Sequence, residues 1–178
     1  MSLDRRAALI GGGTALVAAA LAPLAEGVDR VLAAGDDAAL LTTLAMLEDT
    51  AVYVLTTVGP GLTRAPLPGL AQSFLTHHRD HRAALISAIR RLGAAPPGTD
   101  RPRPDAVPSS PGEPAALAAL LEIEGRLLGA QYAALAALER QSLRAEVASI
   151  FGVDARHAAV WRSASARNPV PSSFVTGP

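Results

Sequence analysis

The sequence predicts an all-α four-helix bundle with a long connection between the second and third helices. Alanine and leucine dominate the composition, and only 3% of the residues are aromatic. Apolar residues recur at the three- and four-residue spacing of amphipathic helices, and the β-branched residues never alternate with polar ones as they would in a strand. One proline-rich stretch divides this periodic part of the chain in two. These features favour two helical hairpins and argue against a sheet.

Length, charge and cysteine content limit the classes of function. A chain of 178 residues is long enough for one domain with a sizeable core. The formal net charge is zero, so no long-range field attracts nucleic acid, and no nucleic-acid partner is expected. Cysteine is absent, which excludes disulfides, thiolate metal ligands and a cysteine nucleophile.

Residues 1–35 have the pattern of an export signal or a membrane anchor. Arg5 and Arg6 precede an apolar run over residues 7–22, as in a twin-arginine signal, which exports folded proteins. Pro23 follows the small residues where cleavage would be expected, so the segment could also stay attached as an anchor or form an ordinary apolar helix. We expect an exported protein of the cell envelope or extracellular space, in contact with the membrane if the segment is not cleaved.

Four helices are expected after this segment. The apolar periodicity places them at residues 37–58, 67–93, 113–140 and 142–165. Together they form a domain over residues 36–166, followed by an extended tail over 167–178. The stretch 94–114 is too rich in proline for regular structure, and it is long enough to run the length of a helix. Such a crossover would leave the second and third helices parallel, with an antiparallel hairpin on either side.

Six polar residues interrupt the apolar faces of these helices, each near the middle of its helix. They are Glu48, His78, His81, Glu124, Asp154 and His157. Burying such groups costs free energy unless a partner satisfies them. Borderline divalent cations prefer carboxylate and imidazole ligands, and paired metals in four-helix bundles are held by acids and by i, i+3 pairs on facing helices. The pattern therefore predicts a metal site in the core. His77 lies one position off the apolar face and is expected at the boundary of the core.

The same stretches resemble the ferritin-like superfamily, in particular its exported, actinobacterial-type ferritin-like domain proteins. The resemblance covers about residues 38–176 and rests on these stretches: Leu47 to Tyr53, His78-Arg79-Asp80-His81, Leu121 to Glu124 with Tyr132, Asp154 to Ala159, and the tail Pro169 to Phe174. It implies that the six polar residues are metal ligands. His78 and Asp154 stand where the superfamily has glutamate. Three carboxylates with three imidazoles suit one metal, or a less oxidising pair, better than a strong ferroxidase centre.

The expected function is thus that of an exported metal-binding protein with a divalent metal, iron or manganese ahead of zinc. In its catalytic form it would be an oxidoreductase acting on dioxygen, peroxide or ferrous iron. Two alternatives remain open. One is a non-catalytic structural or interaction module of the cell envelope with a metal-free polar layer, and the other is a haem held between His81 and His157. Assembly into a homo-oligomer is also open.

Overall fold

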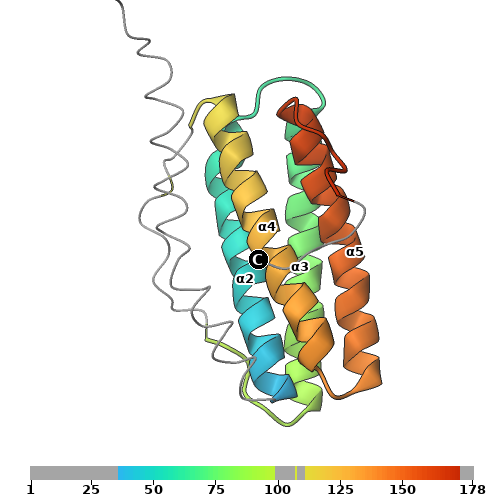
Figure 1. The fold of residues 1–178 in the computed structure, drawn as a ribbon. Coiled ribbons are helices and arrows are strands. Elements are labelled where there is room, and N and C mark those ends of the chain that lie inside the picture. Colours follow the sequence, from blue (N-terminus) through green and yellow to red (C-terminus); the bar gives the residue numbers. More distant parts are fainter. Residues whose placement is uncertain (1–35, 99–106, 108–110, 173–178) are drawn as a thin grey trace, which may run out of the picture.

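Four long helices form the molecule in a computed structural model that describes residues 36–98, 107 and 111–172 (Figure 1). The helices are α2 (Asp37–Val58), α3 (Leu67–Arg91), α4 (Glu113–Ala137) and α5 (Gln141–Ala164), with a short 3₁₀ turn, η1 (Gly59–Gly61), after α2. No strand occurs among the described residues. The predicted all-α four-helix bundle is confirmed. Residues 1–35, predicted as an export signal or anchor, and the end of the tail, 173–178, lie outside the described residues.

The helices are connected as two antiparallel hairpins joined by a crossover. In Figure 1, α2 rises and α3 descends, and then α4 descends again before α5 rises. The connection between α3 and α4 therefore joins opposite ends of the bundle, and these two helices are parallel, as the length of the proline-rich stretch predicts. α2 packs against both α3 and α4, and α5 packs mainly against α4.

Local chemistry accounts for where the helices begin and end. The Asp36 side chain accepts a hydrogen bond from the Ala38 amide at 2.9 Å and so caps α2. α3 ends two residues earlier than predicted, because Gly93 adopts a positive φ of 78° and begins a left-handed cap. α4 ends at Ala137 rather than near residue 140, since the Glu139 amide donates to Asp37 Oδ1 at 2.9 Å and not to its own helix.

At one end of the bundle, a carboxylate at the start of α4 binds the turn between α2 and α3. Glu113, the first residue of α4, accepts hydrogen bonds from the amides of Thr63 and Arg64, both at 2.9 Å. These backbone bonds lower the pKa of Glu113. The Arg64 guanidinium also donates to the Ala164 carbonyl at the end of α5, at 2.7 Å. The turn between α2 and α3 is thereby tied to both helices of the second hairpin.

α2 is the most apolar helix of the bundle. Residues Asp37–Gly61 are long and apolar enough to cross a membrane by length and composition, with a mean hydropathy of 1.5. Half of that apolar window is buried inside the bundle, and α2 contributes ten buried residues to the core. A helix that packs on two neighbours has the same pattern as a membrane span, so this composition follows from its place in the core.

Candidate metal centre

The six polar residues singled out in the sequence come together inside the bundle. α2 supplies Glu48, α3 supplies His78 and His81, α4 supplies Glu124, and α5 supplies Asp154 and His157. Five of these side chains are fully buried, whereas the His81 side chain is 11% exposed. Each helix contributes from near its middle, so the residues meet at one level of the bundle.

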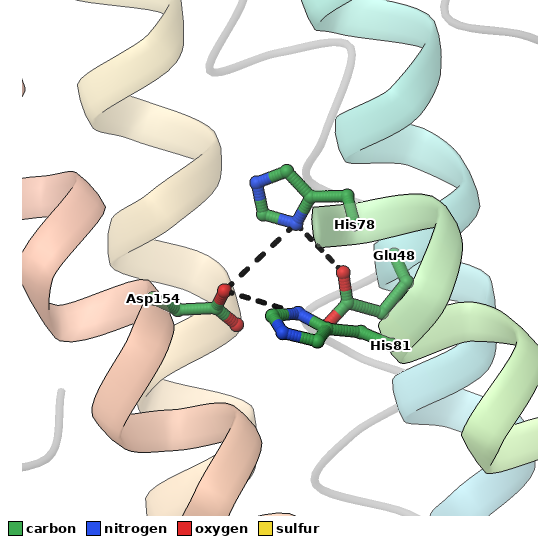
Figure 2. Close-up of side chains that lie close together, drawn as sticks. All are labelled: Glu48, His78, His81 and Asp154. Carbon is green, nitrogen blue, oxygen red and sulfur yellow. Dashed lines mark hydrogen bonds and ion pairs between the residues drawn. The ribbon is translucent and has the colours of Figure 1, made fainter. Parts of the chain in front are cut away.

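The first of two overlapping groups contains Glu48, His78, His81 and Asp154. Figure 2 shows these side chains pointing toward one another from three helices. His78 Nδ1 lies 2.7 Å from Glu48 Oε2, and His81 Nδ1 lies 3.3 Å from Asp154 Oδ1 and 3.5 Å from Glu48 Oε1. One ligand-type atom from each residue lies within 4.8 Å of the other three. The group offers two imidazoles and two carboxylates around one point.

The second group contains His78, Glu124, Asp154 and His157 and meets the same 4.8 Å limit. His78 Nε2 lies 3.3 Å from Glu124 Oε1. His157 Nδ1 lies 3.4 Å from Glu124 Oε1 and 3.5 Å from Asp154 Oδ1. His78 and Asp154 therefore belong to both groups, and the His78 ring stands between the two glutamates. The His78 ring also contacts the two other histidine rings, with centroids 5.9 Å from His81 and 5.1 Å from His157, and a haem between those two residues stays a prediction.

The centre contains buried polar atoms that the protein itself does not satisfy. Five of them have no hydrogen-bond partner among the described residues: Glu48 Oε1, His81 Nδ1, Glu124 Oε2, Asp154 Oδ1 and His157 Nδ1. A buried polar atom left unpaired costs about 1–3 kcal/mol, more when it is charged. Carboxylate oxygens and imidazole nitrogens are the ligands that borderline divalent cations prefer. The donor set therefore fits such a cation.

Protons offset part of the negative charge in the metal-free centre. Burial alone would lower the pKa of His78, but hydrogen bonds with Glu124 and Glu48 outweigh it and raise the pKa to about 10. Burial is likewise outweighed at His81, where Asp154 and Glu48 raise the pKa to about 9. Burial, together with repulsion from the two glutamates, raises the pKa of Asp154. The groups that would bind a metal thus also bind protons.

Two residues outside the predicted set complete the surroundings. Gln131 is buried on α4 and donates from Nε2 to Asp154 Oδ2 at 2.6 Å, which leaves Asp154 Oδ1 facing the centre. Gln131 lies on the apolar face two turns after Glu124, so its position in the sequence could have revealed it. His77, expected at the boundary, is half-buried, and its Nδ1 lies 2.9 Å from His157 Nε2. Burial and the neighbouring His157 lower the pKa of His77.

Comparison with known proteins agrees with this architecture. A family model described as a ferritin-like domain matches residues 57–167, a range that contains five of the six residues and omits Glu48. Among solved structures, the chain is similar to a conserved hypothetical protein, Rv2844, from Mycobacterium tuberculosis. The TM-score is 0.64 at 19% identity, over 81% of this chain and 99% of that one. No curated protein matches. The likeness to the solved structure shows the fold, and the family model covers most of the chain: this protein belongs to the ferritin-like domain family.

Proposed function

We propose that this protein is an exported ferritin-like metal-binding protein whose core holds a divalent metal, iron or manganese ahead of zinc. The observation that carries the proposal is that five buried ligand-type atoms in the two overlapping groups have no hydrogen-bond partner among the described residues. A purely structural polar layer would be expected to pair its buried atoms with one another. Here four of these atoms, Glu48 Oε1, His81 Nδ1, Asp154 Oδ1 and His157 Nδ1, form a row in which neighbouring atoms are 3.3–3.5 Å apart, longer than a good hydrogen bond.

The six residues would hold a metal in two overlapping groups of ligands. Glu48 and His81 belong to one group, Glu124 and His157 to the other, while His78 and Asp154 are shared. Three carboxylates supply three negative charges when ionised, which a divalent ion would offset in place of the protons on the histidines.

In its catalytic form we propose an oxidoreductase that acts on dioxygen, peroxide or ferrous iron. A bound iron or manganese ion would supply the one-electron redox chemistry. His81 is the most exposed of the six side chains, so the approach of a small oxidant or of ferrous iron is expected beside it. An imidazole in place of one core carboxylate makes the centre less anionic, which favours a milder oxidase over a strong ferroxidase.

Export rests on residues 1–35, with Arg5 and Arg6 before an apolar run. Asp36 caps α2, so the helix has its own local start signal directly after this segment.

A metal-free structural module is the second candidate. Its support is the raised pKa values of His78 and His81, which would allow two protons to offset part of the carboxylate charge without a metal. In that case the centre would act only to fix the register of the helices.

Metal content and metal-dependent stability separate the two candidates. The full chain, purified without chelator, is analysed for bound metal and then melted with chelator, Fe²⁺, Mn²⁺ or Zn²⁺. We expect bound metal and a rise in Tm, since a ligand at a hundred times its Kd stabilises the folded state by about 2.7 kcal/mol. His81→Ala should lose most of that gain. A melting temperature that no metal and no chelator changes, in both wild type and variant, would leave the structural module as the function.

A further inference from the structure

We infer that His77 is a positioning residue for the metal centre: it accepts a hydrogen bond from His157 Nε2–H and thereby turns the free nitrogen of His157 toward the metal. The inference rests on the proposed function, because it assigns a role to a residue beside the proposed ligands. It concerns a residue that contributes no atom to either ligand group.

The two ring nitrogens of His157 have different neighbours. Its Nε2 lies 2.9 Å from His77 Nδ1. Its other nitrogen, Nδ1, faces the centre at 3.4 Å from Glu124 Oε1 and 3.5 Å from Asp154 Oδ1, and it has no hydrogen-bond partner among the described residues. One nitrogen of the His157 ring therefore faces His77, and the other faces the metal centre.

The tautomer of the imidazole links these two contacts. A neutral imidazole has one N–H and one lone pair, so placing the proton on Nε2 places the lone pair on Nδ1. Only a nitrogen with a lone pair can bind a metal. An acceptor at His77 Nδ1 thus selects the tautomer of His157 that can act as a ligand, and such outer partners of metal-bound histidines also fix the orientation of the ring.

Phe74 supplies the other restraint on His157. Its ring stacks on the His157 ring with centroids 3.8 Å apart and an angle of 20° between planes. Stacking sets the plane of the ring but not the position of its proton, since both tautomers have the same shape. Within this pair of neighbours, His77 is the one that can distinguish the tautomers.

A histidine at position 77 can also hydrogen-bond to His157 both with and without a bound metal. When no metal is bound, His77 Nδ1–H can donate to His157 Nε2, and His157 Nδ1–H can then point at the carboxylates of Glu124 and Asp154. When a metal is bound, the donor and acceptor roles reverse. A carboxylate or a backbone carbonyl could only accept, so it would satisfy one of the two states alone.

The test compares two replacements of His77 in the full chain, with Co²⁺ as the probe. In His77→Asn the amide oxygen can take the place of Nδ1 as the acceptor, whereas His77→Leu has no acceptor. Loss of an outer partner typically weakens metal binding by about 10- to 100-fold, and we expect that loss for Leu with near-wild-type binding for Asn. Affinity comes from titration, and the visible absorption of bound Co²⁺ reports the geometry of its ligands. Gln72→Leu, an exposed change on the same helix, is the control and should leave both unchanged.

A second measurement does not depend on a variant that folds. Long-range ¹H–¹⁵N NMR of the Zn²⁺-loaded wild type should show the His157 proton on Nε2. A proton on Nδ1, or a His77→Leu variant with unchanged Co²⁺ affinity and spectrum, would overturn the role of His77 while leaving the metal site in place. A wild type that binds neither ion would instead remove the proposed function.

Discussion

His78 is the residue whose loss should damage the metal-free protein most. It is fully buried, with Nδ1 2.7 Å from Glu48 and Nε2 3.3 Å from Glu124. Its pKa of about 10 means that it is a cation at pH 7, between two carboxylates. His78→Leu keeps the apolar bulk of the side chain and a good helix former, but it leaves both glutamates buried without their shared partner.

Comparable substitutions give a range for the stability that His78→Leu should lose. Removing one partner of a buried ion pair destabilises a protein by about 3–5 kcal/mol, out of a total stability of about 5–15 kcal/mol for a typical domain. We therefore expect urea unfolding in the presence of chelator at pH 7 to show a loss of that size. His77→Leu is the matched control, since His77 is half-buried and its pKa is lowered, so that only one neutral hydrogen bond, worth about 1 kcal/mol, is lost.

Two further measurements test whether His78 holds the two glutamates as an ion pair. Adding Glu48→Gln to His78→Leu removes one of the stranded charges and should recover part of the lost stability. Lowering the pH from 7 to 5 should also raise the stability of His78→Leu, because carboxylates buried without their cationic partner take up protons more readily. A His78→Leu protein as stable as wild type in chelator, or a double variant less stable than the single one, would show that His78 does not hold the glutamates as an ion pair.

The other predictions concern pH, packing and export. In chelator, the contribution of His78 and His81 to wild-type stability should be fully present below about pH 6.5 and should be lost as the pH rises to about 9 to 10, because over this range the folded state still holds protons that the unfolded state has lost. Urea unfolding across this range would show no such slope if the two histidines were neutral in the folded state. Gly61→Ala should cost about 1–3 kcal/mol, since a Cβ there would collide with the backbone carbonyl oxygen of Pro111. Gly59→Ala meets nothing within 4 Å and is the control in the same thermal melt. Replacing Arg5-Arg6 by two lysines should keep a folded reporter fused to residues 1–35 in the cytoplasm, and equal export of both fusions would contradict the twin-arginine pathway.

The sequence predicted that the six residues meet at one height along the bundle. Apolar periodicity determines which side of each helix is buried, and each polar residue stands near the middle of its helix. Helices of similar length packed side by side then bring those middles to one height. The same reasoning gave the start and end of α2, because Asp36 and Gly59 are local signals that act within a few residues.

The pairing within that level needed the tertiary structure. Periodicity gives the buried face of a helix but not its rotation relative to a neighbour, and a small rotation decides which of two adjacent residues faces the centre. His77 illustrates this, since it lies one residue before His78 and yet reaches His157 on α5 at 2.9 Å. The sharing of His78 by Glu48 and Glu124 has the same origin, because it requires α2, α3 and α4 to converge on one ring.

What the sequence alone determined is therefore the six residues of the centre and the order of the helices that hold them. Both follow from interactions between residues three or four positions apart, which the chain expresses locally. The tertiary structure decided the contacts between helices, including the end of α4, which Asp37 of α2 sets from more than 100 positions away. It also decided which ligand-type atoms remain without a partner, because only the packed arrangement of four helices determines what each side chain can reach.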